Sequence, residues 1–220
     1  MEYQRVETIK NEGHLVHTEV STRHVSRYSL FTKRIFDILF AVIGLLVLLL
    51  PMLVIGLLIK TTSRGPVLFK QTRYGLNSQP FTLLKFRSMR VNAPQKSNKE
   101  FGTKSMAYYI TPIGNFLRKS SLDELPQLFN IFKGEMSFIG PRPMAMTDAD
   151  VIKMRKSVGA DKVRPGITGL AQVHGRNSIS DEEKVSYDVL YASDCCLKRD
   201  LSIFLRSIVV VLKREGISRR

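Results

Sequence analysis

An uncharged apolar run over residues 38–59, ILFAVIGLLVLLLPMLVIGLLI, is the feature that most constrains this chain. As one α-helix it would extend about 33 Å, at roughly 1.5 Å per residue, which is enough to cross about 30 Å of hydrocarbon. The run starts too late for a secretory signal, and no small-residue cleavage site precedes the basic residues that follow it. We therefore expect a membrane segment.

A proline inside this run decides how the segment could sit in a bilayer. Pro51 leaves 13 residues before it and 8 after it, and arms of about 20 Å and 12 Å would each be too short to cross alone. Both flanks carry four cations, and Lys/Arg-rich flanks stay in the cytoplasm. These flanking cations are Arg23, Arg27, Lys33 and Arg34 before the run, and Lys60, Arg64, Lys70 and Arg73 after it.

These flanks favour a re-entrant helix hairpin over residues 29–61, broken at Pro51, with both ends on the cytoplasmic face of the inner membrane. A kinked helix that spans the bilayer is the alternative, because membrane helices tolerate proline. Residues 1–28 are polar without a clear period, and we interpret them as a flexible N-terminal extension. Residues 62–216 are expected to form a small helix-rich α+β domain with amphipathic interfacial helices.

Local patterns predict several elements of that domain. Two short strands are expected over residues 66–73 and 81–86, around turn formers at 75, 77 and 78. A helix should carry the apolar residues between 122 and 132 and end at Gly134. Ser180 and Glu183 form a capping-box pattern that opens a helix running to about residue 194. A C-terminal apolar stripe fits either an interfacial helix or a core helix: Leu201, Phe204, Leu205, Ile208, Val209 and Leu212.

The charge balance points to a partner rich in phosphate. The chain has 34 Lys and Arg against 19 Asp and Glu, a formal charge of +15. Such a charge suits nucleic acid, an anionic membrane surface or a phosphorylated small molecule. The chain has no Trp, and no nucleic-acid recognition motif is visible, which disfavours a membrane-tethered nucleic-acid-binding module.

An acidic pair at the start of a predicted helix could carry chemistry. Asp123 and Glu124 follow Arg118, and either Ser121 or Asp123 could be the N-cap, with Pro126 favouring Asp123. The helix dipole there would keep Asp123 ionised and attract phosphate. An ionised carboxylate can attack phosphorus, and a neighbouring Glu can hold Mg²⁺. Taken alone, the pair is more simply explained as two acids that stabilise a helix start.

Cations elsewhere in the chain could bind phosphate. Lys85 and Arg87 end the second predicted strand, and Arg142 lies between two prolines that stiffen its backbone. A rigid Arg suits bidentate phosphate binding. Each of these residues alone is also consistent with an ordinary solvated charge.

These pieces occur together in an order that resembles the bacterial sugar transferase family, the monotopic polyprenol-phosphate phosphoglycosyl transferases. The resemblance covers residues 31–213 and is most specific over residues 113–143. The matching stretches are GPVLFKQTRYG (65–75), FTLLKFRSM (81–89), IGNFLRKSSLDELPQLFNIFKGEMSFIGPRP (113–143) and VRPGITGLAQVHGRN (163–177).

The resemblance implies an enzyme of the inner membrane, active on its cytoplasmic face. It would transfer a sugar 1-phosphate from a UDP-sugar to undecaprenyl phosphate, giving undecaprenyl-diphosphate-sugar and UMP, as the first membrane step of exopolysaccharide or capsule synthesis. Asp123 would be the nucleophile of a covalent phosphosugar intermediate, and Glu124 would assist with Mg²⁺. The phosphate-binding residues implied are Lys85, Arg87, Arg118 and Arg142.

The resemblance leaves some points open. Direct metal-assisted transfer without a covalent intermediate is the alternative mechanism, and neither the sugar nor a homodimer is specified. The family's first helix is re-entrant and often breaks at Ser-Pro, whereas this chain has Leu50-Pro51. His174 stands where the family often has Asn, which implies a different donor preference if that loop touches the donor.

Overall fold

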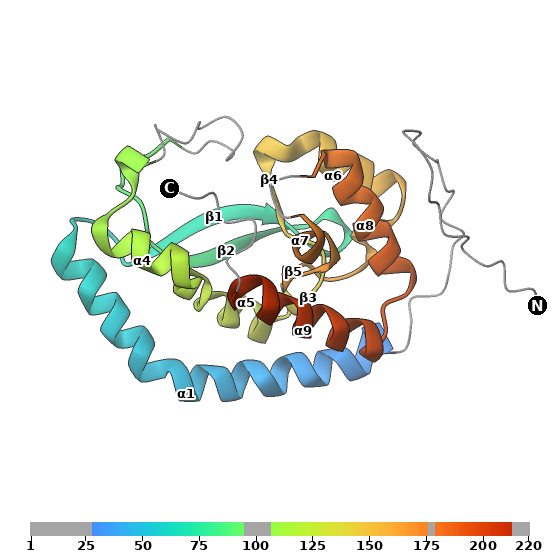
Figure 1. Cartoon of the computed structure of the whole chain (residues 1–220), viewed down its shortest axis with the longest axis horizontal. Coiled ribbons are helices and arrows are strands. Elements are labelled where there is room, and N and C mark those ends of the chain that lie inside the picture. The colour runs from blue at the N-terminus through green and yellow to red at the C-terminus, as the bar shows by residue number, and fades with distance from the viewer. Residues whose placement is uncertain (1–27, 95–106, 176–178, 213–220) are drawn as a thin grey trace, which may run out of the picture.

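The computed structural model describes residues 28–94, 107–175 and 179–212 (Figure 1). The extension expected over residues 1–28 lies outside this part except for Tyr28. A turn of π-helix, Tyr28–Thr32, leads into the long helix α1, Lys33–Thr62. By length and composition, α1 is the one described helix able to cross a membrane.

Helix α1 runs through Pro51 without interruption. Figure 1 shows that it bends, so that its second half climbs beside the rest of the molecule. A proline inside a helix removes one backbone hydrogen bond and clashes with the preceding turn, which kinks the helix. The structure therefore has one continuous helix where the sequence analysis expected a helix broken at Pro51.

The first half of α1 is held to the rest of the molecule by polar contacts. Lys33 pairs with buried Asp200, and Arg34 donates to the carbonyls of Ile131 and Phe132 at the end of α5, Gln127–Lys133. One turn later, Asp37 Oδ1 accepts hydrogen bonds from the Ser137 hydroxyl at 3.0 Å and the Phe138 N–H at 3.2 Å. These contacts fix the start of α1 against the body.

The second half of α1 is held by apolar packing and by one arginine. Ile55 and Ile59 are buried against Phe86 and Leu117. Just beyond the helix end, Arg87 donates hydrogen bonds to three oxygens of residues 63 and 64. Both ends of α1 are thus fastened to the same body.

A three-stranded sheet and a two-stranded sheet form the strand part of the fold. Strands β1, Leu68–Tyr74, and β2, Pro80–Phe86, pair antiparallel across a 3-10 turn, Leu76–Ser78. Strand β4, Met144–Ala145, adds to the other edge of β1. Strand β3, Ser137–Ile139, pairs in parallel with β5, Gly166–Thr168. The two strands predicted from the sequence are confirmed, and the described part of the chain is a helix-rich α+β structure.

Helices cover these sheets (Figure 1). In the core, Ala41 of α1, Leu128 of α5 and Leu83 of β2 pack together, so α5 lies between α1 and the hairpin. Gly134, with φ +92°, ends α5 as predicted, because a left-handed residue there favours glycine. The remaining helices are α4, Pro112–Ser120; α6, Ala149–Ser157; α7, Leu170–His174; α8, Asp181–Ser193; and α9, Leu197–Leu212.

Two of these helices carry features predicted from the sequence. Ser180 and Glu183 form the expected capping box, and α8 ends within one residue of its predicted end. The C-terminal apolar stripe lies on α9 and faces outward, while Ile203 on the opposite side is buried. Among the stripe's described side chains, the core-helix alternative is therefore wrong. The exposed members are Leu201, Phe204, Leu205, Ile208 and Val209.

The outer surface of α1 is also strongly apolar. Leu46 and Leu50 are each 71% exposed, and Val47 is 69% exposed. Soluble monomers rarely expose contiguous apolar surface of this extent. The long helix therefore presents an apolar face that water does not favour.

Candidate functional site

The acidic pair lies in a sharp junction between two helices. Helix α4 opens at Thr111, whose hydroxyl accepts from the Gly114 N–H at 3.0 Å, and it ends at Ser121, which has φ +58°. Leu122–Glu124 then forms a single 3-10 turn. Helix α5 begins after Pro126, a residue that needs no N–H at a helix start.

This geometry corrects both predicted cap registers. Ser121 is left-handed and its side chain makes no cap hydrogen bond, and Pro126, not Asp123, precedes α5. Asp123 thus lies in the 3-10 turn that joins α4 to α5. The expectation that its position keeps the carboxyl ionised is not borne out, because burial raises the pKa of this group.

Glu124 is the residue of the pair that makes ion pairs. Its Oε1 lies 2.6 Å from the Lys85 ammonium on β2 and 3.8 Å from the Arg142 guanidinium. Lys85 is largely buried, whereas about half of the Arg142 side chain is exposed. The structure thus brings together three predicted site residues that are far apart in the sequence.

Asp123 has a different environment. It is partly buried, and burial raises its pKa, with Lys85 opposing that shift, Glu124 adding to it and Arg118 opposing it. Among the described residues, no side chain forms an ion pair or hydrogen bond with its carboxylate. A carboxylate with a raised pKa is more basic, and so more nucleophilic once ionised.

Arg73 joins this cluster, although the sequence analysis assigned it only to a membrane flank. Its guanidinium donates to Gln71 Oε1 and, at 3.2 Å, to the carbonyl of Pro143, the residue after Arg142. Burial, followed by the nearby charge of Arg142, lowers its pKa to about 10. Gln71 and Arg73 share one face of a predicted strand, and that spacing is the signal that could have identified the pair.

Arg87 lies outside the cluster. The whole residue is 4% exposed. Its guanidinium donates at 2.7 Å to the carbonyls of Ser63 and Arg64 and to the Ser63 hydroxyl. Burial lowers its pKa. The carbonyls that it contacts lie just past the end of α1, so both terminal nitrogen atoms of its guanidinium already donate to the protein itself.

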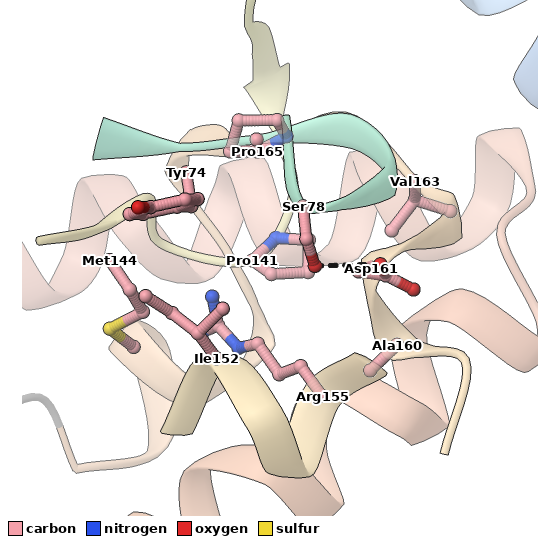
Figure 2. Close-up of a pocket in the computed structure, with 11 residues that line it drawn as sticks. Tyr74, Ser78, Pro141, Met144, Ile152, Arg155, Ala160, Asp161, Val163 and Pro165 are labelled. Atoms are coloured by element: carbon pink, nitrogen blue, oxygen red, sulfur yellow. Dashed lines mark hydrogen bonds between the residues drawn. The ribbon is translucent and has the colours of Figure 1, made fainter. Parts of the chain in front are cut away.

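The loop that carries Arg142 is supported from behind. Arg155 of α6 donates to the Arg142 carbonyl at 2.8 Å and is itself paired with buried Asp188. Figure 2 shows the small cavity beside this support, where Asp161 accepts from the Ser78 hydroxyl at 2.8 Å. Its volume of about 20 Å³ holds roughly one water molecule. The cavity is therefore too small for a sugar nucleotide.

The carboxylates of Asp123 and Glu124 could bind a metal ion only together with substrate oxygens and water. Within residues 28–94, 107–175 and 179–212, no group of three or more His, Cys, Asp or Glu could enclose an ion. Mg²⁺ is commonly bound through one or two carboxylates together with substrate phosphates and water. Two adjacent carboxylates therefore fit a cation that arrives with a diphosphate substrate.

Comparison with known proteins gives relatives of one kind. The chain is 38% identical over 213 residues to the UDP-galactose-lipid carrier transferase of Erwinia amylovora, covering 90% of this chain and 44% of the relative. It is 38% identical over 183 residues to the UDP-glucose:undecaprenyl-phosphate glucose-1-phosphate transferase of Klebsiella pneumoniae, covering 80% and 39%. It is 40% identical over 185 residues to the uncharacterized sugar transferase EpsL of Bacillus subtilis, covering 84% and 89%.

The extent of these matches separates two groups of relatives. The chain spans about two fifths of the length of the Erwinia and Klebsiella proteins but most of the Bacillus protein. The sequence profile for bacterial sugar transferases matches residues 28–214, which include α1, the acidic turn and every cation of the cluster. The chain belongs to the bacterial sugar transferase family.

Proposed function

We propose that this protein transfers a sugar 1-phosphate from a UDP-sugar to undecaprenyl phosphate, releasing UMP and forming undecaprenyl-diphosphate-sugar. The names of the relatives from Erwinia and Klebsiella, with UDP-galactose and UDP-glucose as donors, support a hexose donor. A relative from Sinorhizobium fredii is named as an exopolysaccharide production protein. We therefore assign the reaction to the start of exopolysaccharide or capsule assembly.

The contrast between the two acids carries the mechanism. Glu124 is held by Lys85, whereas the Asp123 carboxylate, among described residues, has no side-chain partner. A group that must form a bond to phosphorus has to be available, and a group that organises charge has to be fixed. This difference makes Asp123 the nucleophile and Glu124 the organising carboxylate.

The reaction then runs in two displacements at one phosphorus atom. A carboxylate oxygen of Asp123 attacks the phosphorus that bears the sugar, and the bond from this phosphorus to the oxygen of UMP breaks. A phosphate oxygen of undecaprenyl phosphate next attacks the same phosphorus, and the bond to Asp123 breaks. The carboxylate is regenerated, and no oxidant or further reactant is needed.

The surrounding cations offset the negative charge that gathers in these steps. Lys85, Arg118 and Arg142 would bind the diphosphate of the donor or the phosphate of the acceptor, and Arg73 would hold the Arg142 loop in place. Glu124, with substrate oxygens, would hold Mg²⁺, which when bound neutralises phosphate oxygens. Arg87 is assigned a positioning role at the end of α1.

The position of α1 supports a re-entrant insertion in which both ends of the helix lie on the same side of the membrane. Asp37 near its start and Ser63 past its end are both bonded to the same body, and one folded body cannot lie on two sides of a bilayer. The bent helix, with its exposed apolar face, would enter the cytoplasmic leaflet of the inner membrane and return. The exposed stripe on α9 would lie in the interface of that leaflet.

Covalent labelling tests the mechanism. The full chain is incubated with a UDP-hexose labelled with ³²P at the phosphorus next to the sugar, without acceptor. We expect about one labelled phosphosugar per enzyme, one UMP released with it, and loss of the label when undecaprenyl phosphate is added. The Asp123→Asn variant should take up no label.

Two results would change the assignment. Turnover without UMP release before the acceptor is added would favour direct transfer, with Asp123 as a metal ligand. Full turnover by Asp123→Asn would exclude both roles for Asp123. A panel of UDP-sugars assayed for UMP release identifies the donor in the same experiment.

A further inference from the structure

A hollow lies at the C-terminal end of α1, away from the acidic turn. It has a volume of about 430 Å³, and its lining includes Ser63 and Arg64 past α1, Arg90 and Asn92 after β2, and Thr111 before α4. Helix α4 separates it from Asp123, since the hollow touches Pro112 at one end of α4 and the acidic turn follows the other. Nine residues of α-helix span about 13 Å. The hollow is therefore separate from the reacting groups.

The charge of the hollow favours an anion. Arg64 and Arg90 both line it, and none of the described residues that line it is acidic. Both arginine residues are exposed, so their guanidinium groups are open to a ligand. Paired guanidinium groups suit a phosphate, because each can donate two parallel hydrogen bonds.

The backbone on both sides of the hollow is fixed in advance. Arg87 holds the carbonyls of Ser63 and Arg64. The next residue, Gly65, has φ +121°, and a Cβ there would lie 2.1 Å from the Arg87 guanidinium. This position thus requires glycine, which lets the chain turn tightly around Arg87.

On the other side, Arg90 is placed by two contacts. Its N–H donates to the Tyr109 carbonyl at 2.8 Å, and its guanidinium carbon lies 5.2 Å from the centre of the Tyr108 ring. A cation over a ring face is held by attraction to the ring. Both cations of the hollow therefore project from anchored backbone.

The residues around the hollow indicate which kind of anion it could bind. The second half of α1 exposes Leu53, Leu57 and Leu58, then hydroxyl side chains at its last turn, and then Arg64. On the opposite side, Val91 and Tyr108 are about two-thirds exposed. An apolar stretch followed by hydroxyls, an aromatic ring and cations matches the change from acyl chains to headgroups in a leaflet.

We propose that this hollow binds the headgroup phosphate of an anionic bilayer phospholipid, whose acyl chains lie along the second half of α1. Arg64 and Arg90 bind the phosphate, and the lipid anchors the end of α1 at the headgroup level. The inference rests on the re-entrant insertion proposed above and not on the transfer reaction. Undecaprenyl phosphate has a phosphate and a tail as well, so the test separates the two lipids.

Ligand-induced stabilisation of the full chain in neutral detergent tests this site. A ligand that binds the folded state raises the unfolding midpoint by mass action. The probes are dioctanoyl phosphatidylglycerol, dioctanoyl phosphatidylcholine, inorganic phosphate and undecaprenyl phosphate. The variants are Arg64→Gln with Arg90→Gln, each single substitution, and a control with Lys133→Gln and Lys153→Gln, which removes the same charge at exposed positions on α5 and α6.

We expect phosphatidylglycerol to raise the midpoint of the wild type, and phosphatidylcholine and inorganic phosphate to have little effect. The double arginine variant should bind phosphatidylglycerol about 30-fold more weakly, the singles should be intermediate, and the lysine control should stay within about twofold. Each of three results would overturn the site: unchanged binding by the double variant, equal loss in the lysine control, or equal stabilisation by inorganic phosphate.

Two further readouts separate this inference from the proposed function. The double variant should keep wild-type UMP release at saturating undecaprenyl phosphate in detergent without phosphatidylglycerol. If instead it loses binding of undecaprenyl phosphate and keeps phosphatidylglycerol, the hollow belongs to the acceptor and the inference is wrong. If the wild type binds phosphatidylglycerol but makes no UMP, the proposed reaction fails while the lipid site stands.

Discussion

Replacing Arg87 by Met tests whether this arginine holds the fold or binds substrate. Arg87 makes three hydrogen bonds of 2.7 Å to the chain just past α1. Met keeps an apolar stem of similar length and removes the guanidinium. If the positioning role is right, the variant should lose stability and keep its affinity for the donor.

The size of the loss follows from two opposing contributions. Hydrogen bonds from a charged donor are each worth about 1.5–3 kcal/mol. Against this, the wild type keeps a charge in a buried place where Arg87 Nε has no partner among the described residues, and Met removes that cost. We therefore expect the free energy of unfolding to fall by about 2–3 kcal/mol, less than the three bonds would give alone.

Unfolding of the full chain in detergent, followed by heat, measures this loss. For a chain of this size, about 1 kcal/mol corresponds to about 2–4 °C, so the midpoint should fall by about 5–10 °C. KM for the UDP-sugar should stay within about twofold of the wild type, because the guanidinium does not face the acidic turn. Arg118→Met is the matched control: it should reduce kcat/KM at least about tenfold and shift the midpoint little.

The opposite pattern would refute this reasoning. If Arg87→Met kept the wild-type midpoint and raised KM for the donor tenfold or more, Arg87 would bind substrate phosphate, as the resemblance implied. The contacts to residues 63 and 64 would then be a resting arrangement that substrate displaces.

Three other perturbations have definite expected outcomes. Asp123→Asn should reduce turnover by at least about 10³-fold. The variant should keep or raise the unfolding midpoint at pH 7, because a raised carboxyl pKa means that the ionised form destabilises the folded state. A lower midpoint in a heat-unfolding scan would contradict this. Turnover of the wild type should fall as the pH drops through that raised pKa, since the protonated acid cannot attack. The acid limb of the kcat–pH profile should move to higher pH in Lys85→Met, because Lys85 lowers the pKa of Asp123; an acid limb that stays at the wild-type pH would contradict this. Asn130→Ala should lower the free energy of unfolding by about 2–4 kcal/mol in a denaturant titration. The reason is that the buried amide forms hydrogen bonds with the Leu84 N–H, the Thr82 carbonyl and Glu135. A loss below about 1 kcal/mol would argue against a stabilising role for these hydrogen bonds.

Elements set by short-range patterns could be predicted from the sequence. The hairpin strands follow alternation and turn residues, and α8 follows its capping box. The acidic turn could not be read in this way. Two cap patterns competed there, and the left-handed Ser121 that decides the geometry depends on how α4 and α5 pack, which no local pattern reports.

Contacts between side chains that lie far apart in the sequence also could not be predicted. The sequence grouped Lys85 with Arg87 because both are cations at one strand end, yet one meets Glu124 and the other meets the end of α1. Residues two apart on a strand share a face, but the strand's path relative to α1 decides what each one contacts. The pairing of Arg73 with the Pro143 carbonyl likewise depends on β4 joining the edge of β1.

In the re-entrant insertion proposed above, the fastening of α1 at both ends would restrict how this protein responds to its bilayer. A free helix adjusts to a thicker or thinner membrane by tilting, but here Asp37 and Ser63 are bonded to the body near either end. In that arrangement, a mismatch in thickness would therefore shift the whole body up or down relative to the leaflet. Because the acidic turn belongs to that body, its distance from a lipid-borne phosphate would change with acyl-chain length, and the turnover rate would report the thickness of the membrane.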